Sequence, residues 1–307
     1  MAETSPHSES DLSGLAGPDR AIGWVAHHPR LPVYSAVAVA AGLGWVYLTA
    51  MVLGARSDDA AVFGPGMALL EPVLGFELPP FLAALCQPLI DVGPTLVSGE
   101  TFVIVLPMWL MMVLAMMLPS AAPMLATYAQ IADTAARKGE PAAPVLVLAS
   151  GYMVIWIGFS LVAALLQSGL TALGALTFAG TPVAPALAGA IFLAAALYQF
   201  TPAKHACLTK CQNPFSYFFA RWTPRSGGLF RLGVEQGLFC LGCCWALMTV
   251  MFAVGVMNLV WTALLCILMT LEKTYPNIWI TKGIGIFLLC VGIAVSGPSL
   301  ASAFLTG

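Results

Sequence analysis

Seven apolar stretches, each long enough to cross a bilayer, constrain this chain more than any other feature of its sequence. A transmembrane helix needs about 20 predominantly apolar residues to span the hydrocarbon core. Of the 307 residues, 60% are hydrophobic and only 8% are charged, whereas soluble domains carry about 25% charged residues. The sequence therefore predicts an all-α fold, a polytopic transmembrane helical bundle of about seven spans. The expected spans are about 34–54, 102–131, 144–167, 183–201, 232–253, 256–272 and 283–303.

The basic residues indicate how the bundle is oriented. With the N-terminus inside, eleven of the twelve lysines and arginines fall on the inner side, and only Arg56 falls outside. Cytoplasmic segments of membrane proteins carry such an excess of basic residues. We therefore expect the N-terminus inside and the C-terminus outside. No short apolar region precedes a cleavage site, so a signal peptide is not expected and the first span stays in the membrane as an anchor.

The segments between the spans divide the chain into a tail and a membrane domain. Residues 1–33 are mostly polar and are expected to form a cytoplasmic N-terminal tail, and residues 34–307 form the transmembrane domain. The outer loop 55–101 is expected to hold interfacial or re-entrant pieces, because five prolines between positions 67 and 94 exclude a regular spanning helix. The inner loop 202–231 carries five basic residues, which are typical of a cytoplasmic loop.

The long apolar run 232–272 needs a separate interpretation. As a single helix it would measure about 60 Å, twice the thickness of the hydrocarbon core. A helical hairpin with its break near Gly255 and Asn258 is therefore expected.

The net charge of −2 and the small number of basic residues argue against a nucleic-acid partner. The expected surrounding is the lipid bilayer.

Five of the eight cysteines fall in two tight groups. Cys207 and Cys211 lie four residues apart, so they share one face if the segment is helical. Cys240 shares a helix face with Cys243 and Cys244 in the same way. Because one inner loop separates the groups, helices four and five can bring them together near the inner leaflet. Two alternatives remain open: a disulfide, which a reducing interior disfavours, and packing of the cysteines as small apolar residues.

Methionines are concentrated in the second expected span, which holds six of the fourteen. Met108, Met112 and Met116 recur every four residues and form a stripe on a helix. Met117 and Met124 lie seven residues apart and share another face. Thioethers, like thiolates, are ligands for soft ions such as Cu(I). The alternative is that methionine fills irregular gaps beside the two prolines that bend this helix.

Sulfur chemistry therefore suggests a metal site. Copper as Cu(I) fits the combined cysteine and methionine content best, and zinc is the second candidate because four thiolates suit it. Histidine is scarce in the chain. The candidate metal ligands are Cys207, Cys211, Cys240, Cys243, Cys244, Met116, Met117, Met124, Met248 and His205. A further candidate polar site comprises Glu235, Glu272, Lys273, Tyr198, Gln199 and Asn258. No combination of residues typical of a catalytic site is present, so catalytic residues are not assigned.

Six motifs occur together in this order: Trp109-x-x-Met112-x-x-Ala115-Met116-Met117-x-Pro119-x-x-x-Pro123-Met124, Gly151-Tyr152 with Trp156, Tyr198-Gln199-x-x-Pro202-x-Lys204-x-x-Cys207-x-x-x-Cys211, Gly237-x-x-Cys240-x-Gly242-Cys243-Cys244-Trp245-Ala246-Leu247-Met248, Gly255-x-Met257-Asn258 and Glu272-Lys273. By these motifs the chain resembles a bacterial family of predicted metal-binding integral membrane proteins, known as domain of unknown function 2182. The resemblance runs from about 109 to 273, just over half of the chain. It implies metal binding in a bacterial cytoplasmic membrane without implying a defined activity.

Several functions are consistent with these residues. The first is handling or transfer of Cu(I) through a cysteine and methionine site, with a metal chaperone as partner. The second is a subunit of a copper-dependent membrane oxidase or monooxygenase that acts on an apolar substrate and needs ligands from a partner subunit. The third is a metal-free solute transporter whose cysteines only pack, and the fourth is a purely structural role in assembly. Whether the protein is an enzyme stays open.

Overall fold

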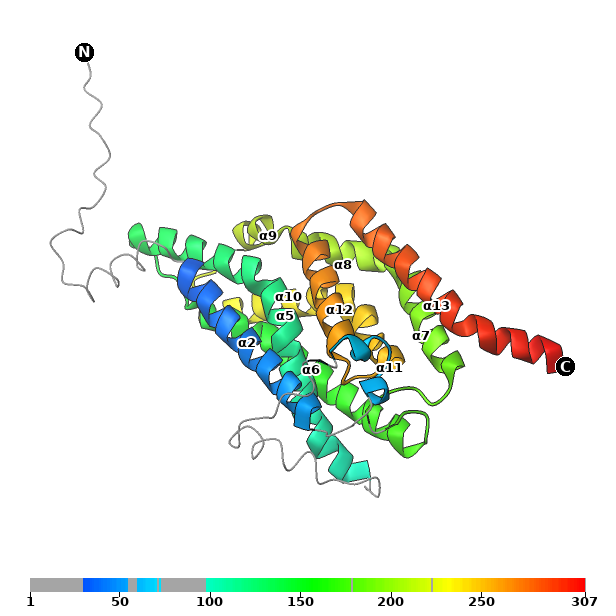
Figure 1. The fold of residues 1–307 in the computed structure, drawn as a ribbon. Helices are drawn as coiled ribbons and strands as arrows, with labels where there is room; N and C mark the ends of the chain where they lie inside the picture. The colour runs from blue at the N-terminus through cyan, green and yellow to red at the C-terminus, as the bar shows by residue number, and fades with distance from the viewer. Residues whose placement is uncertain are drawn as a thin grey trace, which may run out of the picture.

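The computed structural model describes residues 30–54, 60–70, 72, 98–177, 179–221 and 223–306 (Figure 1). Within these ranges the chain forms helices, with one isolated bridge between Leu176 and Pro182. Most of the polar tail 1–33 and most of the outer loop 55–101 lie outside the described residues. The elements are α2 (Arg30–Gly54), η1 (Ala60–Phe63), η2 (Met67–Leu70), α5 (Ser98–Arg137), α6 (Val145–Ala172), α7 (Pro185–Gln199), α8 (Pro202–Gln212), α9 (Pro214–Ala220), α10 (Ser226–Thr249), α11 (Met251–Val254), α12 (Leu259–Thr274) and α13 (Ile278–Thr306).

The helices confirm the membrane class. Among the described residues, five are long and apolar enough to span a bilayer: α2, α5, α6, the run through α10 and α11, and α13. A sixth span results if α7 and α8, which meet at a bend of 65°, count as one. A helix occurs in each of the seven expected ranges, but α12 has only 16 residues. It is therefore shorter than the roughly 20 residues of a full span.

The apolar run 232–272 does form a hairpin. The helical path ends at Gly255, whose φ of +102° lies in the left-handed region that favours glycine. The side chain of Asn258 then caps α12 by accepting a hydrogen bond from the backbone N–H of Trp261, at 3.1 Å. Lys273, near the end of α12, returns to within 3.0 Å of Cys240 in α10. The expected break is thus confirmed at both residues.

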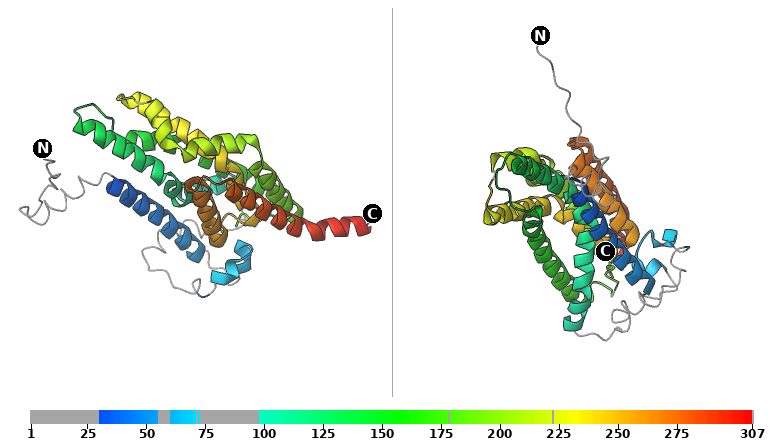
Figure 2. Two further views of the ribbon diagram at one scale, coloured as in Figure 1. Left: turned by 90° about the horizontal axis from the view of Figure 1, so that it is seen from above. Right: turned by 90° about the vertical axis from the view of Figure 1, so that its left-hand side faces the viewer.

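Glycines allow the helices to approach closely. A Cβ atom added at Gly151 of α6 would lie 2.2 Å from the carbonyl oxygen of Phe230, and one added at Gly233 of α10 would lie 2.2 Å from that of Leu148. Backbone therefore packs on backbone where α6 crosses α10, as is common between helices in membranes. Figure 2 shows the helices from two further directions.

Basic residues mark one end of the bundle. At this end the guanidinium of Arg30, at the start of α2, donates to the side chain of Gln130 near the end of α5. The starts of α6 and α10 meet there as well, through Gly151 and Gly233. We call this the basic end. The opposite end, where α2 reaches Gly54, is called the distal end.

At the distal end, the segment 60–70 covers the junction between α11 and α12. Phe63 is 3% exposed and Met67 is fully buried. The side-chain amide of Asn258 donates to the carbonyl oxygen of Pro65 at 2.9 Å. This part of the expected outer loop therefore packs on the bundle.

The expected inner loop 202–231 is largely helical. Thr201 caps α8 by accepting from the backbone N–H of Lys204 at 3.3 Å, and Pro202 occupies the first turn. Proline favours that position because its missing N–H is not needed there. The bend between α7 and α8 turns α8 across the bundle, toward α10 and α12 (Figure 1).

Candidate functional site

The two cysteine groups meet between α8 and α10. The sulfur atoms of Cys211 and Cys243 lie 3.9 Å apart and join the two helices. Along α10, the sulfur of Cys244 lies 3.8 Å from that of Cys243 and 3.9 Å from that of Cys240. The three α10 thiols are buried, whereas Cys207 and Cys211 on α8 are half-buried. The expectation that one helix face presents each group is consistent with these contacts.

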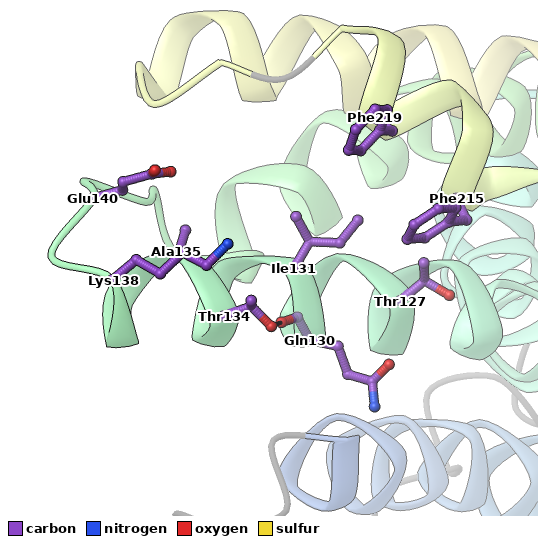
Figure 3. Close-up of a pocket in the computed structure, with 9 residues that line it drawn as sticks. All are labelled: Thr127, Gln130, Ile131, Thr134, Ala135, Lys138, Glu140, Phe215 and Phe219. Atoms are coloured by element: carbon purple, nitrogen blue, oxygen red, sulfur yellow. Dashed lines mark hydrogen bonds between the residues drawn. The ribbon is translucent and has the colours of Figure 1, made fainter.

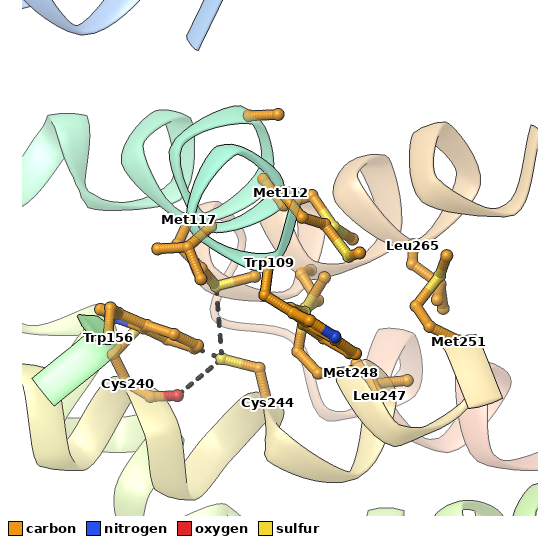
Figure 4. Packing of buried hydrophobic residues seen from close by; sticks show 14 of the residues in the cluster. Trp109, Met112, Met117, Trp156, Cys240, Cys244, Leu247, Met248, Met251 and Leu265 are labelled. Atoms are coloured by element: carbon orange, nitrogen blue, oxygen red, sulfur yellow. Dashed lines mark hydrogen bonds between the residues drawn. The ribbon is translucent and has the colours of Figure 1, made fainter. Parts of the chain in front are cut away.

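A methionine extends the row of sulfurs into the bundle. The sulfur of Cys244 lies 4.0 Å from the thioether sulfur of Met117 on α5 (Figure 4). Met117 is fully buried. The described residues therefore contain a continuous series of sulfur contacts, in the order Cys211, Cys243, Cys244 and Met117, drawn from three helices. We call this series the sulfur row.

Cys207 lies against the α10 backbone beside the sulfur row. A Cβ atom added at Gly242 would lie 2.6 Å from the Cys207 sulfur. The carbonyl oxygen of Gly242 also accepts a hydrogen bond from the hydroxyl of Tyr198 at 2.6 Å. Gly242 thus leaves room for the fifth thiol, and Tyr198 fixes the backbone next to it.

Two polar side chains converge on Cys240. The hydroxyl of Tyr152 on α6 and the amine of Lys273 on α12 each lie 3.0 Å from its sulfur. The Lys273 amine also donates to the hydroxyl of Ser120 on α5 at 2.8 Å. None of the salt bridges among the described residues involves Lys273. Its positive charge is therefore placed to balance negative charge on the thiol group.

The sulfurs do not form a closed cage. No group of three or more histidine, cysteine, aspartate or glutamate side chains in the described part of the chain is placed to hold a metal ion. Two sulfurs bound tetrahedrally to one ion at about 2.3 Å lie about 3.8 Å apart. Neighbouring pairs along the row match that separation, but the thiols of Cys243 and Cys244 are turned toward the carbonyl oxygen of Cys240, at 3.1 and 2.6 Å. Rotation of these side chains is needed for three sulfurs to converge on one ion.

The other expected methionines lie in different places. Met248 is fully buried and lies near Trp109 and Met112 (Figure 4). Met116 is also fully buried, and its backbone carbonyl faces the Cys266 sulfur at 4.0 Å. Met124 lies two turns beyond Met117 toward the basic end and is 7% exposed. Of the four expected methionines, Met117 is the one for which a sulfur contact with a described cysteine is found.

His205 occupies α8, two residues before Cys207. Residues two apart on a helix do not face each other. The imidazole is half-buried, and its position differs from the face that carries Cys207 and Cys211. The structure therefore gives no geometric support for His205 as a ligand beside these cysteines.

Two of the polar candidates, Glu272 and Glu235, belong to separate ion-pair clusters. Glu272 is 2% exposed and pairs at 2.8 Å with the amine of Lys204 on α8, which is fully buried. Glu235 pairs with Arg221 at 2.6 Å and Arg231 at 3.2 Å, and accepts from the hydroxyl of Tyr217. Burial, followed by the Glu235 hydrogen bond, raises the pKa of Tyr217 to about 12. The first cluster holds α8 to α12, and the second links α9 to α10.

Two further polar candidates, Gln199 and Asn258, differ in their hydrogen bonding. Gln199 is fully buried at the end of α7, and neither polar atom of its amide has a hydrogen-bond partner within the described structure. Asn258 caps α12 and also holds Pro65, as described above. Neither residue contacts the sulfur row in the hydrogen bonds found for the described residues.

Sequence reasoning missed Tyr152 and Lys204 as parts of the site. Their partners lie 88 and 68 residues away in sequence, Cys240 and Glu272 respectively. Such pairings leave no local spacing pattern. The signal that could have found them is their presence in the motifs Gly151-Tyr152 and Pro202-x-Lys204.

A separate groove of about 510 Å³ lies at the basic end, between α5 and α9 (Figure 3). Phe215 and Phe219 line one side, and Ile131 and Lys138 line the other. Its lining contains no cysteine or methionine. The groove is therefore distinct from the sulfur row.

A comparison with protein families relates the chain to copper. Comparisons with curated proteins and with solved structures found no match. A model of the PpoB2 family, described as a copper chaperone, matches residues 106–295. The match supports a copper-related family, but not the particular family named from the motifs. Because the matched range covers more than half of the 307 residues, the chain belongs to the PpoB2 copper chaperone family.

Proposed function

We propose that this protein is a membrane-embedded copper chaperone that carries Cu(I) as its cargo along the sulfur row. The observation that supports this proposal most directly is the series of sulfur contacts of 3.8 to 4.0 Å from Cys211 to Met117. Sulfur ligands select soft ions, and Cu(I) is the soft ion that both thiolates and thioethers accept. Zinc, which suits four thiolates, is less well served by a row that ends in a thioether.

The gradient of burial along the row indicates a direction of uptake. Cys207 and Cys211 are half-buried on α8, whereas Cys243 and Cys244 are 2% and 1% exposed. Copper delivered at the basic end meets the α8 thiols first. Each neighbouring pair of sulfurs is close enough to share an ion, so the cargo moves by exchange of one ligand at a time.

The charged and polar side chains around Cys240 support a buried site in which the cysteines are thiolates. Metal-bound cysteines are deprotonated, and buried negative charge is costly unless it is paired. Lys273 supplies a positive charge 3.0 Å from Cys240, and Tyr152 supplies a hydrogen bond at the same distance. These two side chains position and stabilise the α10 thiol group without binding the cargo themselves.

Metal analysis tests the proposal. Protein purified anaerobically in detergent and loaded with Cu(I) is expected to hold about one copper per chain. Cys243→Ser and Cys244→Ser are expected to lose most of it, while Cys290→Ser, which changes an exposed cysteine of α13, keeps it. Thermal unfolding of each variant establishes that the fold persists. Stoichiometric copper in a variant that lacks both Cys243 and Cys244 would refute the sulfur row as the carrier, and zinc without copper would refute Cu(I) as the cargo.

The same proposal places the protein in the cytoplasmic membrane of a bacterium, with a soluble copper donor on the inner side and a copper enzyme as the acceptor. Labelling with a membrane-impermeant maleimide tests the orientation. In a variant that keeps only Cys211, inverted vesicles are expected to react and intact cells are not. Reaction in intact cells alone would reverse the orientation.

A further inference from the structure

Three methionines from different parts of the fold meet at the distal end. Met51 of α2, Met108 of α5 and Met257 of the turn before α12 line one small cavity. Its volume is about 10 Å³, which is about the space that one water-sized particle occupies. Met108 is fully buried, and Met51 and Met257 are 5% and 7% exposed. The cavity is therefore lined by buried methionines and has about the volume of a single small particle.

The lining of this cavity does not suit water. The other residues around it are Leu48, Val52, Val256, Leu259 and Thr262. Thr262 has a hydroxyl, but that hydroxyl already donates to the carbonyl oxygen of Asn258 at 2.7 Å. A buried water usually makes two to four hydrogen bonds, which this lining does not supply. The three methionines are the other side chains of the lining that carry a possible ligand atom, a thioether sulfur, and thioethers suit soft ions.

Methionines also lie between this cavity and the sulfur row. The Thr262 hydroxyl, on the cavity wall, lies 3.9 Å from the sulfur of Met251. Met251 is fully buried at the end of the α10 run, one turn beyond Met248. Figure 4 shows Met248 and Met112 between Met251 and the contact of Met117 with Cys244.

The segment 60–70 is linked to the cavity wall through Asn258. The segment 60–70 packs on the α11–α12 junction, and Asn258, whose backbone oxygen binds Thr262, also holds Pro65 at 2.9 Å. An ion in the cavity would thus lie next to the segment that leads out of the bundle on the side opposite the basic residues.

We propose that Met51, Met108 and Met257 form a second binding site, for a soft monovalent metal ion held by thioethers alone. The site differs from the sulfur row in ligand type and in position. Neutral thioethers do not balance the charge of the ion, so this site binds more weakly than the thiolates and releases its ion more readily. Both properties suit a site at the distal end from which an acceptor takes the metal.

Silver tests the second site because Ag(I) is a soft monovalent ion that does not change oxidation state under these conditions. The background is the chain with all eight cysteines changed to serine, which removes the thiols of the sulfur row and every other thiol that would bind Ag(I). Ag(I) binding is measured by titration calorimetry and by elemental analysis. The background is expected to bind about one Ag(I) per chain. A triple change in this background is expected to abolish that binding: Met51→Leu, Met108→Leu and Met257→Leu combined. Met269→Leu, which replaces a methionine of α12 that is 1% exposed, is the matched control and is expected to keep it.

A second arm does not depend on the folding of the serine background. In the chain with all its cysteines, the triple leucine change is expected to lower the Ag(I) count by one ion per chain. Leucine and methionine have similar volumes, so the fold should persist, and thermal unfolding verifies this. An unchanged count in this arm, or a serine background that folds but binds no Ag(I), overturns the second site. The Cu(I) content of Cys243→Ser is measured in a separate experiment. Failure of the second site and failure of the sulfur row therefore give different results.

Discussion

The amine of Lys273 lies 3.0 Å from the sulfur of Cys240 and 2.8 Å from the hydroxyl of Ser120. One side chain of α12 thus joins α10 to α5 beside the sulfur row. A Cu(I) ion bound by two thiolates carries a net negative charge, and at this distance a cation stabilises it strongly in a medium of low dielectric constant.

Replacing Lys273 is expected to weaken copper binding without preventing folding. Lys273→Met should lower the Cu(I) affinity roughly tenfold, which corresponds to about 1.4 kcal/mol. Lys273→Arg should keep most of the affinity because it keeps the charge. Competition with a Cu(I) chelator measures both. Equal affinities in wild type and Lys273→Met would mean that the amine only anchors the end of α12.

Gly242→Ala is expected to displace the thiol of Cys207 and slow copper uptake. The new Cβ would lie 2.6 Å from that sulfur, so the Cys207 side chain must move. Alanine itself favours the helix by about 1 kcal/mol relative to glycine, so the protein should unfold no more easily. Stopped-flow measurement of Cu(I) uptake gives the rate.

The matched control for this change is Gly227→Ala in the first turn of the same helix, where an added Cβ meets no other atom within 4 Å. Its uptake rate should equal that of the wild type. If Gly242→Ala also matches the wild type, Cys207 has no part in uptake.

Glu272→Gln is expected to destabilise the protein by about 3–5 kcal/mol, because it leaves the charge of a fully buried Lys204 without its partner. Changing both residues, Lys204→Met with Glu272→Gln, should recover part of the loss. Chemical unfolding in detergent measures the double-mutant cycle. Arg137→Gln, which breaks an exposed ion pair with Asp133, serves as the control and should have little effect. A stability of Glu272→Gln close to that of the wild type would show that the pair does not hold α8 in place.

Gly233→Ala is expected to push α6 and α10 apart. The added Cβ would lie 2.2 Å from the carbonyl oxygen of Leu148, and backbone cannot rotate away as a side chain can. Overpacking of this kind typically costs about 1–3 kcal/mol. Thermal unfolding is the measurement, with Gly158→Ala as the control because an added Cβ there meets nothing within 4 Å. Equal unfolding temperatures for the two variants would contradict the close crossing.

Much of the fold follows from local sequence properties. Apolar length alone located all seven helical ranges, and the break at Gly255 and Asn258 followed from the excessive length of a single helix. The helical spacing of Cys240 and Cys244 likewise anticipated their contact at 3.9 Å. These features depend on residues close together in the sequence, where helical geometry is regular.

The parts that sequence did not predict depend on tertiary contacts. Lys273 was expected to belong to a polar site, but its contact with Cys240 arises because the hairpin folds back. Met51 belongs to none of the methionine patterns in the second span, and meets Met108 only because α2 packs on α5. The bend before α8 had a readable signal, since Thr201 followed by Pro202 is a typical helix start.

Helix α12 ends in two adjacent residues that hold different partners: Glu272 binds Lys204 of α8, and Lys273 binds Cys240 of α10. Its other end is tied through Asn258 to Pro65 of the distal segment. One short helix, α12, is therefore bound both to α8, which carries Cys207 and Cys211, and to α10, which carries the other three clustered cysteines. A displacement of α12 at the distal end would therefore act on both groups of cysteines, because the same helix is bound to α8 and to α10.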